Sequence, residues 1–262
     1  MTFSLLTYNV LFNKAFLQLE KILFKYKPDL LCFQEVDTSE KNLIKLDKFG
    51  YTLADYSNSF IKFGKIYGVA TYFNRNKFKF LMSDSLKIST NLSEFFFTLI
   101  QTLVRQNKPK TVLRTDLLHK QTRSLITICN AHMLVIAPNS LRTNHINKAL
   151  GLLNIKNKTK LIIGGDFNYL PYRRKRLEKM MKKYGLTEAT KNIQQTFDIN
   201  IVGDKGRLTP LEHLFMKFID KIFSHRMKND YIFFRGLQLK KTKRIEVGFS
   251  DHYPIISTFK IT

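Results

Sequence analysis

Short apolar runs recur along the chain, separated by polar or glycine-containing segments. Runs of this length predict strands that are buried in a core. They predict strands at Phe3–Val10, 29–36 ("DLLCFQEV"), Gly68–Phe73, Phe78–Leu81, 124–135 ("SLITICNAHMLV"), 160–166 ("KLIIGGD"), 230–239 ("DYIFFRGLQL") and 253–261 ("YPIISTFKI").

Three segments between these runs predict helices. From Lys14 the apolar residues follow helical spacing until Pro28, which ends the helix. Pro138 opens a second helix that continues through Asn154, and Tyr172–Tyr184 forms a basic helix that the next glycine stops. We find no internal repeat, low-complexity tract or linker. Short strands with interspersed helices therefore predict a single α+β domain over residues 1–262.

Two segments differ from this pattern. Leu92–Gln106 is strongly apolar, with Ser93 as a candidate N-cap. It predicts either a core helix or strand, or a hydrophobic lip that contacts substrate or membrane. Asn192–Leu208 is polar and contains glycine, which predicts a long loop.

The charge balance changes the picture more than the hydrophobic content does. The chain has 44 Lys and Arg residues and 20 Asp and Glu residues, which gives a formal net charge of +24. Such a field favours polyanions, either nucleic acid or an anionic membrane surface. A coding bias towards Lys, Asn, Ile and Phe is an alternative source of the charge, since the chain holds 23 Phe and no Trp. The electrostatic consequence is the same.

The number of cysteines and the first residues of the chain are informative about the cellular compartment of the protein. Only Cys32 and Cys129 occur, each inside an apolar run, which excludes a disulfide scaffold and favours a reducing compartment. No apolar run approaches the length of a membrane span. The first ten residues lack a basic region and a cleavage signature. We therefore expect a cytoplasmic protein, and a monomer.

Polar side chains stand where the predicted strands begin or end. The segment "LIIGGDFNYLP" runs from three apolar residues into two glycines, an acid and an amide. Similar positions are held by Asn9, Glu35, His132, Asp166, Asn168, Asp230 and the segment Ser250–His252. Such residues would lie along one edge of a sheet. Because clustered carboxylates repel one another and hard oxygen ligands suit Mg²⁺, the pattern predicts a bound cation.

Six short motifs carry these residues in a fixed order: "TYN", "QEV", "NAH", "GDFN", "DYIF" and "SDH". In this order the chain resembles the endonuclease/exonuclease/phosphatase superfamily, which has the DNase-I-like fold. The resemblance spans the chain from Asn9 to His252. It implies a four-layered αββα sandwich, with two sheets packed face to face and helices outside. It also implies a phosphoester hydrolase that depends on Mg²⁺ or Mn²⁺.

The resemblance assigns a role to each motif residue. Asn9 and Glu35 would hold the metal, with Asp251 as a ligand or a close neighbour. For Asn9 a hydrogen bond at the strand end is an alternative. The remaining histidines are expected to be structural or on the surface: His119, His145, His213 and His225.

The other motif residues would do the chemistry. Asp166 would align or deprotonate the attacking water, and Asn168 would contact the phosphate. His252, oriented by Asp230, would act as a general base or as a cationic phosphate binder. His132 would stabilise charge on the phosphoryl oxygens, with a satisfied core histidine as the alternative.

One assignment has a rival. Asp220 lies in "FIDKIF", which imitates the "DYIF" motif of Asp230. We favour Asp230 because its strand and its spacing before "SDH" fit better.

The resemblance implies a phosphoester substrate, and the expected class of that substrate rests on charge. A basic run follows "GDFN" directly, and "KKTKR" precedes "SDH". Both favour a phosphate backbone. The expected substrate-binding residues are Arg142, Arg173, Arg174, Lys175 and Arg176.

Three function classes remain. The first is a phosphodiesterase that acts on nucleic acid. The second is a lipid or phosphoinositide phosphodiesterase of the sphingomyelinase type, with Phe95–Val104 as a membrane-contacting lip. The third is an inactive binding module, which the filled catalytic positions disfavour. "TYNVLFN" lacks the acid that abasic-site enzymes carry after this asparagine, which argues against that subgroup.

Overall fold

The computed structural model describes residues 1–86, 88, 110–135, 137–153, 159–198, 200–201, 221 and 227–262. Several predicted features lie outside these ranges. They are the apolar segment Leu92–Gln106 with its candidate lip Phe95–Val104, residues Asp220, His213 and His225, and much of the loop Asn192–Leu208.

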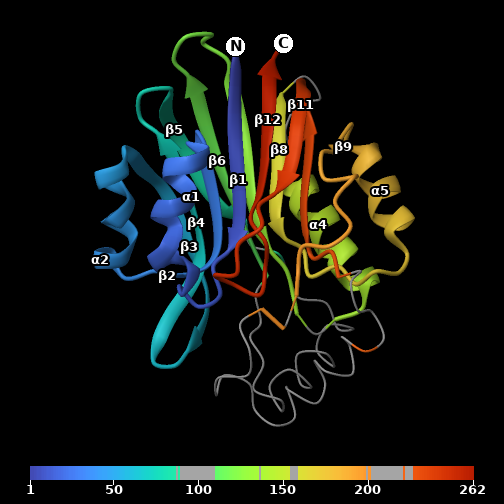
Figure 1. The fold of residues 1–262 in the computed structure, drawn as a ribbon. Coiled ribbons are helices and arrows are strands. Elements are labelled where there is room, and N and C mark those ends of the chain that lie inside the picture. Colours follow the sequence, from blue (N-terminus) through green and yellow to red (C-terminus); the bar gives the residue numbers. More distant parts are fainter. Residues whose placement is uncertain are drawn as a thin grey trace.

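Two sheets form the centre of the molecule (Figure 1). The first is six-stranded in the order β11-β12-β1-β2-β4-β3. Its strands are β1 (Thr2–Asn9), β2 (Leu30–Asp37), β3 (Tyr51–Lys62), β4 (Lys65–Asn74), β11 (Leu237–Arg244) and β12 (Ile255–Ile261). Strands β1 and β2 run parallel, while the other pairs are antiparallel.

The second sheet is also six-stranded, in the order β5-β6-β7-β8-β10-β9. Its strands are β5 (Phe78–Leu86), β6 (Thr111–His119), β7 (Leu125–His132), β8 (Lys160–Asp166), β9 (Thr187–Glu188) and β10 (Asp230–Arg235). Here β7 and β8 are the parallel pair. Both sheets are therefore mixed.

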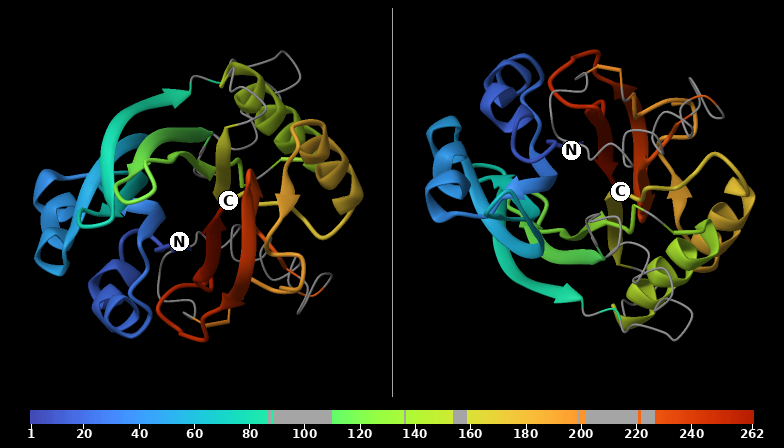
Figure 2. Two further views of the ribbon diagram at one scale, coloured as in Figure 1. Left: turned by 90° about the horizontal axis from the view of Figure 1, so that it is seen from above. Right: turned by 90° about the horizontal axis from the view of Figure 1, so that it is seen from below.

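Helices cover the outer face of each sheet, on opposite sides of the molecule (Figures 1 and 2). Those on the first sheet are η1 (Ala15–Gln18), α1 (Leu19–Tyr26), α2 (Glu40–Leu43) and η2 (Ile44–Phe49). Those on the second sheet are α4 (Asn139–Leu152) and α5 (Arg174–Lys183). The four layers confirm the αββα sandwich that the motifs implied.

The apolar runs are explained by burial on both faces of the central strands. In β1, Phe3 and Leu5 pack between the two sheets, while Leu6 and Tyr8 pack under α1. In β8, Ile162 packs between the sheets, and its neighbours face α4 and α5. Successive side chains of a strand point to opposite faces, so a strand covered on both sides is apolar throughout.

Some predicted elements needed correction. The run 230–239 is two strands rather than one, because the chain turns at Gly236 (φ +68) and crosses from the second sheet to the first. Strands β3 and β6 were not predicted. Strand β3 lies at a sheet edge and is only partly buried. In β6 the apolar run is interrupted by Arg114 and Asp116, which form an ion pair at 2.7 Å.

The topology brings the polar strand ends to one edge. The parallel pairs end together, with Asn9 opposite Gln34 and His132 opposite Asp166. Antiparallel β10 begins there, with Asp230 opposite Asp166. Both chain termini lie at the other edge (Figure 1). Among the described residues, no helix combines the length and hydrophobicity that crossing a membrane requires.

Candidate active site

The predicted catalytic and metal residues meet in one cluster at this edge of the two sheets. Asn9 and Glu35 come from the first sheet, whereas His132, Asp166 and Asp230 come from the second. The segment before β12 adds Asp251 and His252, because β12 runs antiparallel to β1 and starts where β1 ends. Most of these side chains are buried.

Asn9 joins the two sheets at the centre of the cluster. Its Nδ2 donates to Asp166 Oδ2 at 3.0 Å and to Glu35 Oε1 at 3.3 Å. Its Oδ1 accepts from the backbone N–H of Leu11 at 3.0 Å. The same side chain therefore makes both the hydrogen bond at the strand end and the contacts with Glu35 and Asp166.

Glu35 reaches the cluster through an irregularity in its strand. The pairing of β2 with β4 shifts register between Phe33 and Val36, and Glu35 itself has φ 58. The loop after β1 is also left-handed, and its Phe12 N–H donates to Glu35 Oε2 at 3.1 Å. Burial, reinforced by the charge of Asp251, raises the pKa of Glu35 to about 7.

His252 is held by an aspartate on each side. Its Nδ1 lies 2.8 Å from Asp230 Oδ2, and its Nε2 lies 3.7 Å from Asp166 Oδ2. Burial opposes the charged imidazole, but these two carboxylates outweigh burial and keep the pKa of His252 well above its usual value. The structure thus pairs His252 with Asp230, as the motif spacing predicted. The rival, Asp220, lies outside the described residues.

Ser250 positions the segment that carries His252. Its Oγ donates to the backbone carbonyl of Asn9 at 2.8 Å and lies 3.1 Å from Asp251 Oδ1. The backbone N–H of His252 donates back to Ser250 Oγ at 3.1 Å. The first residue of "SDH" therefore fastens this motif to the end of β1.

His132 is fully buried beside two acids. Its Nε2 lies 3.6 Å from Asp166 Oδ2 and 3.8 Å from Glu35 Oε1. Neither ring nitrogen has a hydrogen-bond partner within the described ranges. Burial lowers the pKa of His132 to about 4. A histidine with a purely structural role in the core would have a hydrogen-bond partner for its ring. The geometry therefore favours a histidine whose hydrogen-bond partner is a ligand.

Asn168 and Gly165 shape the end of β8. Asn168 has φ 49, and its N–H donates to Asp166 Oδ1 at 2.9 Å. Its Nδ2 donates to the carbonyl of Met133 at 2.9 Å, so this amide, expected on the phosphate, is engaged with backbone here. Gly165 has φ +137, and a Cβ there would meet the Ala131 carbonyl oxygen at 2.0 Å.

The donor set fits a divalent cation. Ligand atoms of Asp166, Asp230 and His252 lie within 4.8 Å of one another. Burial raises the pKa of Asp166 and of the half-buried Asp251, as it does for Glu35. Asp230 Oδ1 is buried without a hydrogen-bond partner among the described residues. Crowded buried carboxylates of this kind are what a cation would neutralise. The tightest group differs from the predicted ligands, Asn9, Glu35 and Asp251.

Arg142 was expected to bind substrate, but its side chain is buried and bonded to the protein. Its side chain is 1% exposed. The guanidinium donates to the carbonyl of Leu134 at 2.9 Å, to that of Val135, and to Asn139 Oδ1 at 3.0 Å. Burial lowers the pKa of Arg142 to about 10. This residue fixes the segment that follows His132.

The basic run lies in the outer helix layer rather than in the cluster (Figure 1). Arg173, at the N-cap, has φ 56 and is exposed. Arg174 is half-buried, whereas Lys175 and Arg176 are exposed. The four residues therefore do not form one surface, because a helix turns by about 100° per residue.

Two features were missed in the sequence. Gln34 Nε2 donates to Asn130 Oδ1 at 2.6 Å across the sheets, and Asn130 Nδ2 donates to the carbonyls of Phe33 and Ala70. Gln34 and Asn130, the first residues of the "QEV" and "NAH" motifs, thus link the two sheets. Their place inside those motifs was the available signal.

The second missed feature is an aromatic wall, made by Phe12, Phe60, Phe63 and Tyr67. The Phe60 ring centroid lies 6.2 Å from that of His132, so the wall borders the cluster. Phe63 is 58% exposed. Phe12 is distant in the chain from the other three, and only the phenylalanine spacing in "SFIKF" hinted at the wall.

Known proteins share this architecture. The sequence profile described as "Endonuclease/Exonuclease/phosphatase family" matches residues 6–252. A comparison with curated protein sequences gave no significant match. Among solved structures, the human Nocturnin catalytic domain with bound sulfate is 17% identical, with a TM-score of 0.67 over 100% of this chain and 95% of that one.

Two further structures are similar. D. rerio TDP2 complexed with a single-strand DNA product is 15% identical, with a TM-score of 0.63 and 99% of each chain covered. A family protein from Leptotrichia buccalis C-1013-b is 20% identical, with a TM-score of 0.66 over 99% of this chain and 100% of that one. At these identities the structures establish the fold alone. The profile match over nearly the whole chain assigns it: this protein belongs to the endonuclease/exonuclease/phosphatase family of phosphoester hydrolases.

Proposed function

We propose that the protein is a divalent-metal-dependent phosphodiesterase that hydrolyses nucleic acid. The observation that carries the proposal is the row Asp230–His252–Asp166 beside His132, whose ring nitrogens have no partner among the described residues. This is an arrangement of acids and imidazoles that can handle a water proton and phosphoryl oxygens at the same place.

Glu35, with Asn9 and Asp251, would hold Mg²⁺ or Mn²⁺. The elevated pKa of Glu35 supports its part in this assignment, since a cation would stabilise the charged carboxylate. When bound, such a metal neutralises the phosphate and stabilises the charge that develops on its oxygens.

The protein's own residues would then divide the work. The water oxygen forms the new bond to phosphorus while the ester P–O bond breaks, and Asp166 takes the water proton. Burial raises the pKa of Asp166, which makes it a better base. The raised pKa of His252 favours its cationic form, and so a phosphate-binding rather than a base role. His132, neutral and buried, would donate from one nitrogen to a phosphoryl oxygen.

Charge and the aromatic wall support nucleic acid as the substrate. The net charge of +24 favours a polyanion. Phe12, Phe60 and Phe63 beside His132 offer ring faces on which unpaired bases can stack. The similar fold of D. rerio TDP2 was solved with a single-strand DNA product, which is consistent with this choice.

One observation favours the lipid alternative. The hairpin of β3 and β4 carries three exposed apolar side chains next to the aromatic wall. Ile61 is 75% exposed, Phe63 58% and Ile66 45%. A protruding apolar tip of this kind can enter a membrane interface. With the predicted lip outside the described residues, this hairpin is the lipid-contacting candidate that the structure supports.

The test is a panel of labelled single-stranded DNA, RNA and phospholipid substrates, each assayed with EDTA and with Mg²⁺ or Mn²⁺ restored. We expect cleavage of nucleic acid that EDTA abolishes. Glu35→Gln should lose most of the turnover and remain folded, whereas Asp84→Asn, which changes an exposed acid on β5, should keep it. Full activity in EDTA would exclude the metal mechanism.

The lipid alternative has its own readout. Ile61→Ser combined with Phe63→Ser should abolish activity on vesicles if lipid is the substrate. Cleavage of phospholipid with none of DNA or RNA would overturn the nucleic-acid proposal.

A further inference from the structure

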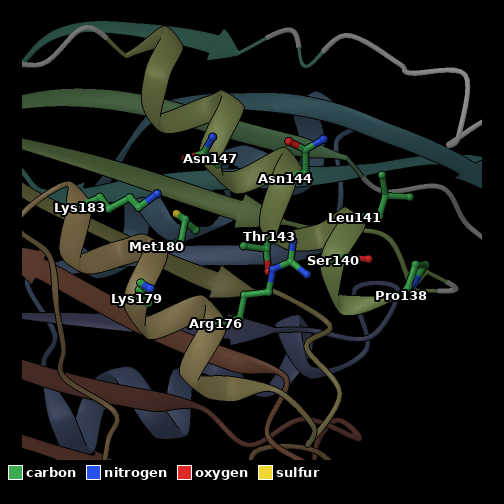
Figure 3. A pocket seen from close by; sticks show the side chains of 10 residues that line it. All are labelled: Pro138, Ser140, Leu141, Thr143, Asn144, Asn147, Arg176, Lys179, Met180 and Lys183. Carbon is green, nitrogen blue, oxygen red and sulfur yellow. The ribbon is translucent and has the colours of Figure 1, made fainter.

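A groove of about 610 Å³ lies between α4 and α5, on the outer face of the second sheet (Figure 3). Pro138, Ser140, Leu141, Thr143, Asn144 and Asn147 line it from the α4 side, and Arg176, Lys179, Met180 and Lys183 from α5. None of the catalytic residues is among them. The groove is therefore separate from the active site.

The cations of this groove share one face of α5. Arg176, Lys179 and Lys183 are spaced i, i+3 and i+7, which places them on one side of a helix, and all three are exposed. Among the described residues no acidic side chain lines the groove, and α4 contains none along its whole length. Glu178, the acid within α5, does not line it.

The opposite wall is polar and uncharged. Asn144 and Asn147 line the groove from α4 (Figure 3). Their amides can donate to anionic oxygens as well as accept. Tyr184 Oη donates to Asn147 Oδ1 at 2.9 Å, and this hydrogen bond joins the C-terminal end of α5 to α4.

The groove is linked to the catalytic cluster by one residue. Thr143 Oγ1, in the groove, donates to the carbonyl of Asn139 at 2.8 Å and lies 3.4 Å from Tyr169 Oη, and Tyr169 directly follows Asn168. Tyr169 Oη in turn donates to the carbonyl of Arg173, at the start of α5. One wall of the groove therefore packs against Tyr169, which directly follows the "GDFN" motif.

We propose that this groove is an exosite for the phosphate backbone of single-stranded nucleic acid, outside the nucleotides at the scissile bond. The proposal rests on the proposed nucleic-acid activity for its choice of polyanion. From Arg176 to Lys183 the helix rises roughly 10 Å. This is longer than the distance of about 3.4 Å that separates successive phosphates along one strand of a duplex, so the three cations can contact more than one phosphate. A flat membrane surface would reach the helix ridges rather than a recess between two helices.

The experiment measures binding of an oligonucleotide of about 20 nucleotides by wild type and by Lys179→Gln/Lys183→Gln, as a function of salt. The matched control is Lys79→Gln/Lys182→Gln. It removes the same charge from exposed lysines, one of them on α5, that do not line the groove. Binding is measured in EDTA, so the result does not depend on turnover.

Each neutralised phosphate contact contributes about 0.7 to the slope of log K against log salt for single strands. The groove variant should lose about 1.4 of slope and bind about 25-fold more weakly at about 0.1 M salt. The control should bind as wild type does. Cleavage of a dinucleotide should be equal in all three proteins, because it cannot reach the groove.

Other outcomes overturn the exosite. Equal weakening in both double variants would show a non-specific effect of net charge. Loss of binding to vesicles of phosphatidylserine and phosphatidylcholine, with DNA binding retained, would assign the groove to a membrane. Normal DNA binding by the groove variant together with normal cleavage would reject the exosite and leave the proposed function intact. If the protein cleaves no nucleic acid but the groove variant binds it more weakly than wild type does, the exosite stands and the proposed function is rejected.

Discussion

Glu35 and Asn168 share an unusual backbone, since both have positive φ without being glycine. Left-handed conformations of such residues cost about 1 kcal/mol or more each. Here Glu35 places its carboxylate against the Asn9 amide, and Asn168 points its N–H at Asp166. The site therefore combines strained backbone with buried acids, and both lower the stability of the metal-free protein.

The Asp230–His252 contact gives the sharpest prediction for a single residue. Asp230→Asn should reduce turnover by about two to four orders of magnitude, because the amide no longer stabilises the imidazolium or fixes its ring. The assay is steady-state cleavage of a small phosphodiester, with circular dichroism as a check on folding. Asp220→Asn should stay near the wild-type rate. The opposite ranking would show that the second "D-x-I-F" motif had been misassigned.

His119 gives a prediction about pH far from the site. Burial, with Lys77 nearby, lowers its pKa, and its Nδ1 accepts from the N–H of Thr122 at 3.2 Å. Because the unfolded chain binds the proton more readily, the stability that neutral His119 contributes is present above about pH 6.5 and lost below it.

Urea unfolding of wild type and His119→Asn should reveal this. The slope of unfolding free energy against pH should be shallower in the variant below about pH 6.5, by at most about 1.4 kcal/mol per pH unit. The asparagine retains an acceptor for Thr122. Parallel slopes would show that His119 does not titrate on unfolding.

At the scale of elements, the sheet edge depends on a glycine. A Cβ on Gly165 would meet the carbonyl oxygen of Ala131 on the neighbouring strand at 2.0 Å, and the φ of +137 is itself unfavourable for other residues. Strands β7 and β8 must pair closely here because their last residues, His132 and Asp166, both enter the site.

Gly165→Ala should therefore lower the unfolding free energy by about 3 kcal/mol or more, or prevent folding. Gly151→Ala is the matched control. It lies in the last turn of α4, where a Cβ meets nothing within 4 Å, so it should raise stability by up to about 1 kcal/mol. Soluble yield and urea unfolding measure both. Equal effects would mean that the close approach at Gly165 is relieved by movement of the strands.

At the scale of the whole molecule, the site joins the two sheets. Asn9 and Glu35 belong to one, Asp166 and Asp230 to the other, so a cation held among them would bind the folded state and not the unfolded chain. Metal binding should then stabilise the entire sandwich.

At about 100 times its dissociation constant, Mg²⁺ or Mn²⁺ should add about 2.7 kcal/mol and raise Tm by about 5–10 °C relative to EDTA. Glu35→Gln should remove most of this shift. Scanning calorimetry measures both proteins, and Asp84→Asn should keep the wild-type shift. An unchanged Tm in wild type with added metal would contradict a cation site between the sheets.

Most residues of the site were predicted from the order of the six motifs. Asn9, Glu35, His132, Asp166, Asp230 and His252 were all expected together at strand ends, and they lie together. Strand ends are local features, since an apolar run and the polar residue that follows it are adjacent in the chain. The αββα layers followed from the family resemblance rather than from periodicity alone.

Arg142 shows why the basic residues were harder to place. Its charge suggested substrate, but the fold turns it inward onto the carbonyls of Leu134 and Val135. Arg173 to Arg176 are consecutive in sequence and diverge around a helix. Whether a cation is on a surface, and which surface, depends on packing that no local pattern records.

The sequence by itself determined most strands of the core, the residues at their ends and the excess of positive charge. It did so because burial on two faces and strand termination leave marks within a few residues. The tertiary structure alone decided the bridge from Gln34 to Asn130, the aromatic wall beside His132 and the groove between α4 and α5. Each of these joins side chains that are distant in the chain, and only the packing of the four layers sets their distances.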